Sequence, residues 1–153
     1  YRYLLRQCRD AAVAEELFQD VWMNLIRARA GYTVQAKFTT YVYRLAHNRL
    51  IDHYRKHAHA TAVSFEDEGG EAWMELPDDR ERPADDALDA KRQAGRLLEL
   101  ISALPEAQRE AFLLQQEGGM SVEAIAHATG VTRETAKSRL RYALAKLRQG
   151  MRE

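Results

Sequence analysis

The sequence predicts an all-α protein with two small helical domains, residues 1–60 and 88–153, joined by a flexible acidic linker over residues 61–87. Apolar residues recur at helical spacing on both sides of the linker, and no segment shows a convincing strand pattern. The charges are sorted along the chain. Between Glu66 and Asp89 there are 11 acidic and two basic residues, a balance of −9, and because the net charge is zero the remainder carries +9.

Two helices are predicted in the first domain, over residues 11–30 and 38–57. In the first helix, apolar residues follow the spacing of one helix face, and Gly31 supplies a stop. In the second, the same periodicity gathers apolar residues on one side. The two apolar sets are Val13, Leu17, Phe18, Val21, Trp22, Leu25 and Ile26, and then Val42, Tyr43, Leu45, Ala46 and Leu50.

The acidic middle of the chain lacks apolar periodicity and is too polar to bury a core, which favours a linker. Gly69, Gly70 and two prolines interrupt it. Trp73 and Met74 stand isolated there, so they could dock on a partner but cannot fold the segment alone.

The second domain is predicted to hold helices over residues 88–103, 105–116, 122–128 and 133–149. Pro105 suits a first helical residue, and Gly118 and Gly119 suit terminators. Ser121 and Thr132 are predicted N-caps.

Residues 121–140 have the pattern of a helix-turn-helix, with small Ala126 where two helices approach and Gly130 where the turn needs positive φ. A buried face is expected beyond the turn, leaving a basic face exposed. The expected buried residues are Ala136, Leu140, Ala143, Leu144 and Leu147, and the expected exposed ones are Lys137, Ser138, Arg141 and Tyr142.

From Val131 to Arg152 there are seven basic residues and one acidic residue, Glu134, as expected of an element that enters a DNA groove. Arginine and lysine on this face can reach guanine edges, while Ser138 and Arg139 could equally hold phosphate. The alternative is an ordinary solvated amphipathic helix that serves protein contact alone. The small-residue spacing and the basic face together favour DNA.

Two sets of motifs resemble extracytoplasmic-function sigma factors. The C-terminal half is similar to region 4 of that family, which reads the minus 35 promoter element, through Leu104-Pro105, Arg109-Glu110, Phe112, Gly119-Met120-Ser121, Ile125-Ala126, Gly130, Thr135 and Lys137-Ser138-Arg139-Leu140. The segment Ala14–Val21 resembles the polymerase-binding helix of region 2.2. The promoter-melting segment is matched by Phe38, Tyr43-Arg44-Leu45-Ala46, Asn48, Asp52 and Arg55.

This resemblance implies three partners: core RNA polymerase, promoter DNA and an anti-sigma factor. Glu16, Gln19 and Asp20 would dock on the β′ clamp helices. The minus 10 contacts would come from Lys37, Tyr41, Arg44, Asn48, Arg49, Arg55 and Lys56. The minus 35 contacts would come from Arg133, Lys137, Ser138, Arg139, Arg141 and Tyr142.

The residues themselves partly support these roles. A face away from the main apolar stripe carries Glu16, Gln19, Asp20, Met23 and Arg27, although a solvated face would look the same. Tyr41, Arg44, Asn48 and Arg55 fall within one arc of their helix, a mixture suited to an unpaired DNA strand. Tyr41 could instead be core packing.

Metal, cofactor and catalysis are not predicted. His53 and His57 stand four residues apart with His47, Asp52 and His59 nearby, but no cysteine cluster accompanies them, so surface histidines near DNA phosphates are favoured over zinc. There is no phosphate-binding loop, no nucleophile beside a base and no carboxylate pair in an acid/base frame. The chief rival function is an autonomous helix-turn-helix transcription factor.

The single cysteine, Cys8, cannot form an internal disulfide, and no apolar run approaches the roughly 18 residues of a membrane helix. A cytoplasmic protein without membrane insertion is therefore expected. The chain begins at Tyr1 with a helical pattern already running, which favours further residues before it in the natural protein.

Overall fold

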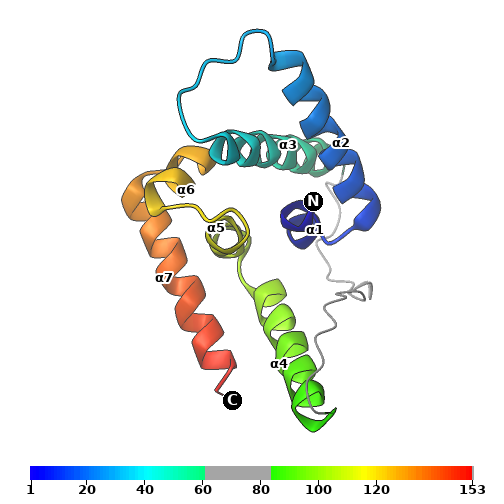
Figure 1. The fold of residues 1–153 in the computed structure, drawn as a ribbon, viewed down its shortest axis with the longest axis vertical. Coiled ribbons are helices and arrows are strands. Elements are labelled where there is room, and N and C mark those ends of the chain that lie inside the picture. The colour runs from blue at the N-terminus through cyan, green and yellow to red at the C-terminus, as the bar shows by residue number, and fades with distance from the viewer. Residues whose placement is uncertain (61–83, 153) are drawn as a thin grey trace.

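The computed structural model describes residues 1–60 and 84–152, and these residues are helical apart from short turns and one loop (Figure 1). No strand occurs in this part of the chain, so the predicted all-α class is confirmed. The helices are α1 (Arg2–Cys8), α2 (Ala11–Ala28), α3 (Phe38–Ala60), α4 (Ala84–Ala103), α5 (Glu106–Gln116), α6 (Val122–Thr129) and α7 (Arg133–Gly150).

A short helix, α1, opens the first half and was not predicted as a separate element. It ends at Cys8, and the left-handed φ of 58° at the C-cap residue Arg9 turns the chain toward α2. Asp10 then caps α2, because its carboxylate accepts hydrogen bonds from Ala12 N (2.9 Å) and Val13 N (3.1 Å). The seven-residue helix is held by its neighbours, since an isolated helix of that length is unstable in water.

The apolar face of α2 is narrower than the sequence predicts. Leu17 and Val21 are buried, as expected. Trp22 and Ile26 are about half exposed, at 48% and 51%, so the prediction that they belong to the buried stripe is wrong. They occupy the edge of the helix that α1 and α3 do not cover.

In the second half, α5, α6 and α7 form a three-helix unit, and α4 precedes them. Ser121 and Thr132 cap α6 and α7 as predicted, by accepting from Ala124 N (3.1 Å) and Thr135 N (3.2 Å). Pro105 is the N-cap of α5 with extended ψ of 141° rather than its first helical residue.

The predicted linker is shortened at its C-terminal end, because α4 already begins at Ala84. Residues 61–83, which include Trp73 and Met74, lie outside the described residues.

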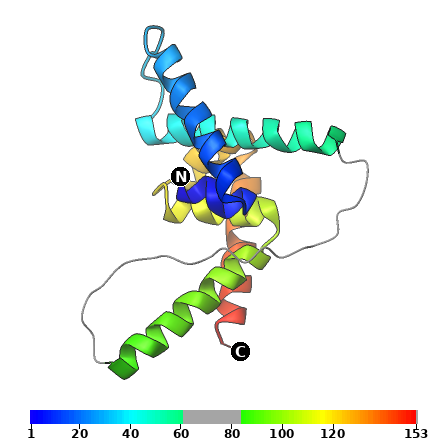
Figure 2. The same ribbon diagram turned by 90° about the vertical axis from the view of Figure 1, so that its right-hand side faces the viewer.

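Helix α4 joins the rest of the second half mainly through α7 (Figure 2). Arg96 donates from Nε (2.9 Å) and Nη2 (2.6 Å) to the carbonyl oxygen of Gly150, the last residue of α7. Gly150 is closely packed against Leu100, and a Cβ at this position would overlap the leucine side chain. The C-terminal end of α7 is therefore fixed by α4.

The two halves pack on each other. Helix α1 lies against α5, and α3 lies against α6, so both halves contribute apolar side chains to the buried core (Figures 1 and 2). At this junction Tyr3 and Leu4 from α1 are buried, as are Leu113 and Leu114 from α5.

The turn between α6 and α7 gives a test of backbone geometry. Gly130 has φ of 68°, whereas Gly95 lies in the exposed interior of α4, and a Cβ added at either position would meet no neighbouring group within 4 Å. We expect Gly130→Ala to lower the free energy of unfolding by about 1–2 kcal/mol. Gly95→Ala should raise it by about 0.5–1 kcal/mol. Urea unfolding followed by far-UV circular dichroism checks both, and equal effects would contradict the strained-turn explanation.

Candidate nucleic-acid interface

Helices α6 and α7 form the predicted helix-turn-helix. Gly130 adopts the left-handed conformation expected of it, and Val131 N donates to Ala126 O (3.1 Å) across the turn. Ala126 is buried where the helices approach. The close approach fixes α7 relative to α6, so side chains on the outer face of α7 have defined positions.

The outer face of α7 is basic. Arg133, Lys137, Arg141 and Tyr142 are exposed, and the guanidinium of Arg141 lies 5.1 Å from the centroid of the Tyr142 ring. Ser138, predicted to project, is only partly exposed, as is Arg139. The opposite face of α7 buries Ala136, Leu140, Ala143 and Leu147, and Leu144 is partly buried.

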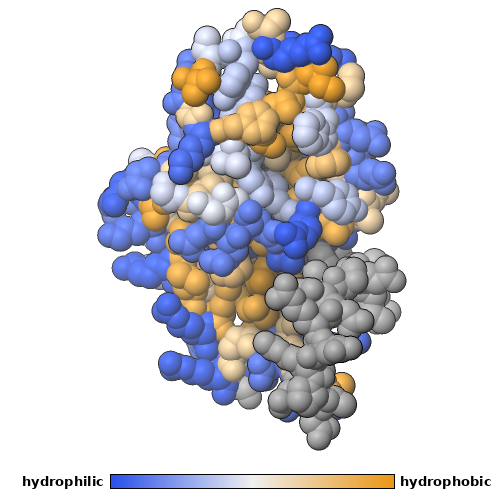
Figure 3. All heavy atoms as spheres, viewed as in Figure 1, coloured by the Kyte–Doolittle hydropathy of each residue, from blue (hydrophilic) through white to orange (hydrophobic). Residues whose placement is uncertain are grey.

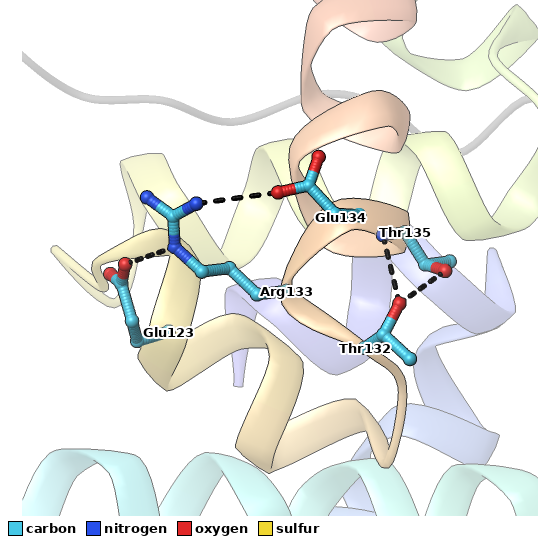
Figure 4. A network of polar contacts seen from close by, with 5 residues as sticks. All are labelled: Glu123, Thr132, Arg133, Glu134 and Thr135. Carbon is cyan, nitrogen blue, oxygen red and sulfur yellow. Dashed lines mark hydrogen bonds and ion pairs between the residues drawn. The ribbon is translucent and has the colours of Figure 1, made fainter.

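Arg133 is held by two carboxylates (Figure 4). Its Nε donates to Glu123 Oε1 (2.6 Å) and its Nη1 to Glu134 Oε1 (3.4 Å). The hydrogen bond from Arg133 lowers the pKa of Glu123 below its ordinary value of 4.5, so this carboxylate is ionised at neutral pH. Sequence reasoning missed Glu123, because nothing in a local pattern links residues 10 positions apart on two helices.

A pocket of about 390 Å³, called the Asn48 pocket below, lies where α3 meets the loop that precedes it. Tyr41, Arg44 and Asn48 line it from α3, together with residues of the loop between Gly31 and Ala36. The structure therefore brings together three of the four residues predicted to share one arc. Arg55, the fourth, is exposed farther along α3 and does not line the pocket.

The pocket also contains a residue from the other half of the chain. His127 of α6 lines it, and Arg44 Nη1 lies 3.1 Å from His127 Nε2. A guanidinium only donates, so the imidazole nitrogen is the acceptor in this contact. Sequence reasoning missed His127, which belongs to a helix 83 residues away from Arg44.

Tyr41 is half-buried, and its ring centroid is 5.0 Å from that of Tyr32. It lines both the Asn48 pocket and an adjacent apolar pocket of about 300 Å³. Tyr41 is thus part of a pocket wall and not fully enclosed in the core. The remaining predicted minus 10 residues, Lys37, Arg49 and Lys56, lie at or near the surface, and Arg49 approaches Asp52 at 3.9 Å.

The histidines do not all lie at the surface. His47 is half-buried, and its Nδ1 lies 2.5 Å from Glu110 Oε1. The rings of His53 and His57 lie against each other with centroids 4.0 Å apart. Partial burial, and then the neighbouring His57, lower the pKa of His53, so that ring is protonated less readily than an ordinary histidine. Within residues 1–60 and 84–152, no group of three or more acidic, histidine or cysteine side chains could hold a metal.

Helix α2 presents a second candidate surface. Glu16, Gln19 and Asp20 are all exposed, as predicted. Advancing 100° per residue, the exposed side chain of Met23 falls on the same face as Glu16, Gln19 and Asp20, as predicted. The exposed side chains of Ile26 and Trp22 lie beside this face, although sequence reasoning placed them in the apolar stripe. Exposed apolar residues continue into the loop and the start of α3 with Val34 and Phe38, and Figure 3 shows apolar side chains at this end of the molecule.

None of the described helices is long and apolar enough to span a bilayer.

Family models match both halves of the chain: sigma-70 region 2 over residues 1–60 and sigma-70 region 4 over residues 94–147. The helix-turn-helix thus lies within a region 4 module. The Asn48 pocket is lined mainly by the region 2 module, with His127 contributed by the region 4 module. This pair of modules defines a sigma factor of RNA polymerase.

Curated relatives agree along nearly the whole chain. The ECF RNA polymerase sigma factor RpoE of Cereibacter sphaeroides is 31% identical over 150 residues, which cover 97% of this chain and 78% of the relative. The RNA polymerase sigma factor CarQ of Myxococcus xanthus is 29% identical over 147 residues, with coverages of 96% and 79%. The chain belongs to the extracytoplasmic-function (ECF) family of sigma factors, which excludes an autonomous transcription factor.

The fold is also similar to that of a solved structure, the sigma factor RpoE from Bartonella quintana in complex with the anti-sigma factor NepR. The TM-score is 0.76, with 19% sequence identity, over 99% of this chain and 88% of that chain. The arrangement of the helices is therefore shared.

The Glu123–Arg133 pair predicts an altered titration at the start of the helix-turn-helix. We expect the Glu123 carboxyl to titrate below its ordinary pKa of 4.5, because the ionised form accepts from Arg133. The stabilisation by this pair is present at neutral pH and is lost as the pH falls through the folded-state pKa. Carbon-detected NMR of the side-chain carboxyl measures it.

Arg133→Gln should return the Glu123 titration toward its ordinary value, while Arg92→Gln, which changes a guanidinium on α4, should leave it unchanged. An ordinary titration in the unmodified protein would show that the pair does not persist in solution.

Proposed function

We propose that this sigma factor directs RNA polymerase to its promoters through three surfaces: the outer side of α2 for the polymerase, the Asn48 pocket for the minus 10 element, and the basic face of α7 for the minus 35 element. The observation that carries the proposal is the pairing of an exposed basic recognition helix with a separate pocket that combines an amide, a guanidinium and an aromatic ring. One surface suits duplex DNA and the other suits an unpaired base.

The polymerase surface combines acceptors with apolar anchors. Glu16, Gln19 and Asp20 would meet donors of the β′ clamp helices, and Trp22 and Ile26 would supply buried contact area. Interface energies concentrate on aromatic anchors within a polar surround, which is the composition of this side of α2. The acidic residues would set orientation and association rate more than affinity.

The minus 10 surface would hold a base extruded from the melted duplex. Extruding a base requires a few kcal/mol of unstacking and unpairing energy, and binding in a pocket with its phosphates on cations offsets that. Asn48 can both donate to and accept from a base edge, and Tyr41 offers an aromatic face. Arg44 would contact backbone or base beside them. Lys37, Arg49, Arg55 and Lys56 would hold phosphates along the outside.

The minus 35 surface would lie in a major groove, as the second helix of a helix-turn-helix does. Lys137 and Arg141 would reach base edges, with Tyr142 beside Arg141. Ser138, Arg139 and Arg133 are assigned to the DNA backbone, and Arg133 must exchange at least part of its contact with Glu123 for phosphate.

The remaining parts of the proposal concern partners and location. An anti-sigma factor is the proposed regulator, supported by the likeness in fold to a sigma factor solved with one. The protein would act in the cytoplasm, where its polymerase is, and would supply specificity without catalysing a reaction of its own.

Reversal of charge on α2 tests the polymerase surface. The double substitution Glu16→Lys and Asp20→Lys should weaken capture by core polymerase at least tenfold, since it replaces two acceptors with cations at one interface. Glu99→Lys on α4 is the matched control and should leave capture unchanged. Co-purification with immobilised core polymerase, titrated over protein concentration, measures both. If the unmodified protein, the double variant and the control were captured equally well, the assignment of this face to polymerase binding would be wrong.

Substitutions on the two proposed DNA surfaces should impair different steps of transcription initiation. Lys137→Ala should weaken recruitment to the upstream duplex, with a loss of about 1–3 kcal/mol if a base contact is removed. Asn48→Ala should leave duplex recruitment nearly intact and reduce open-complex formation, and a premelted promoter should partly restore the defect.

Permanganate footprinting on duplex and premelted templates, with core polymerase present, separates these two steps. The same defect for both substitutions on both templates would contradict the division between the surfaces, as would melting of DNA by the chain without polymerase.

A further inference from the structure

The Asn48 pocket is shared between the two halves of the molecule. Arg44 and Asn48 line it from the region 2 half, while His127 reaches it from the first helix of the helix-turn-helix. The contact between Arg44 and His127 takes one of the two polar groups that the proposed function assigns to an extruded base. In this arrangement, which we call the closed form, the second half of the chain partly occupies the proposed minus 10 site of the first half.

A buried carboxylate holds the halves in this arrangement. Glu110 of α5 is 6% exposed, and its Oε1 accepts from Tyr3 Oη (2.6 Å) of α1 and from His47 Nδ1 (2.5 Å) of α3. Burial, and then the neighbouring Glu110, raise the pKa of Tyr3 well above its usual range, so the phenol remains a donor. One oxygen of Glu110 therefore joins both DNA-binding halves.

Other polar contacts also cross the junction. Arg6 pairs with Glu117 at 3.0 Å, and both side chains are mostly buried, whereas Arg2 pairs with the same carboxylate at 3.3 Å but is largely exposed and contributes less to stability. Gln7 accepts from Arg109 (2.8 Å), yet its buried Nε2 has no hydrogen-bond partner within the described residues. An unpaired buried donor destabilises the closed form and regains a partner in water when the halves separate.

The closed form cannot serve both promoter elements together. Elements centred near minus 10 and minus 35 are about 25 base pairs apart, which is roughly 85 Å of B-form DNA at about 3.4 Å per base pair. Asn48 and His127 line one pocket, and Lys137 follows His127 by 10 residues, which span at most about 36 Å even when fully extended. The two proposed DNA surfaces are therefore too close, and the halves must separate before both can bind.

We propose that the described conformation is a self-occluded state of the sigma factor, with Glu110 as its latch and His127 as the group that obstructs the minus 10 pocket. Separation of α3 from α6 and of α1 from α5 frees Arg44 and the pocket. This inference rests on the proposed function for its consequence on DNA, whereas the latch itself is a property of the chain alone.

Energy transfer between two fluorophores on the full chain tests the latch without DNA or polymerase. Labels at Ala58→Cys on α3 and Ala145→Cys on α7, both exposed, are introduced with Cys8→Ser. Glu110→Gln removes the charge that accepts two hydrogen bonds, and we expect the ratio of open to closed molecules to rise about tenfold. Tyr3→Phe, which removes only one donor, should have a smaller effect. Asp89→Asn, which breaks an ion pair within α4, should have none.

Obstruction of the pocket is tested separately with His127→Ala, an exposed position whose change should not unfold the protein. This variant should bind a single-stranded minus 10 oligonucleotide several-fold more tightly than the unmodified chain, and Asn48→Ala should abolish the gain. Unchanged energy transfer in both latch variants, with native helicity by circular dichroism, would overturn the latch. Unchanged oligonucleotide affinity in His127→Ala would overturn the obstruction.

The proposed function fails by a different result, namely the absence of promoter-dependent transcripts when the unmodified chain is combined with core polymerase. That result leaves the energy-transfer measurement fully interpretable.

Discussion

The carboxylate of Glu110 is the group on which the relation between the two halves depends. It is buried, it accepts from Tyr3 and His47 on two different helices, and both of these belong to the other half of the chain. A buried charge is tolerated only when it is hydrogen-bonded, and removal of its partners is strongly destabilising. The hydrogen bonds to this oxygen therefore stabilise one packing arrangement of α1 and α3 on α5. Other arrangements would leave the carboxylate buried without partners, so Glu110 helps to specify how the halves meet.

Local sequence signals account for the elements of the fold. Helical periodicity located α2, α3 and α5 through α7 to within a few residues, and the caps Ser121 and Thr132 and the turn at Gly130 are where their chemistry predicts. The predictions worked because each depends on residues fewer than about five positions apart. They failed for α1, whose seven residues are too few to display a period and gain stability from α2 and α5.

The candidate sites were only half visible in the sequence, for the same reason. Tyr41, Arg44 and Asn48 could be grouped because one helix carries them. His127 could not, and neither could the bond between Tyr3 and Glu110, because the partners are 83 and 107 residues apart and no pattern relates them. The exposure of Trp22 was missed because periodicity identifies an apolar residue but not the width of the surface that neighbouring helices cover.

Helix α7 has 18 residues and is about 27 Å long at 1.5 Å per residue, with its exposed basic face beginning at Arg133 and with Gly150 at its other end. At its C-terminal end, Gly150 is contacted by Arg96 and Leu100 of α4. Helices α5 and α6 pack against the rest of α7, so the helix is held along its length by three neighbours. The direction in which its basic face points therefore depends on packing contacts at both ends of the helix, including contacts far from that face.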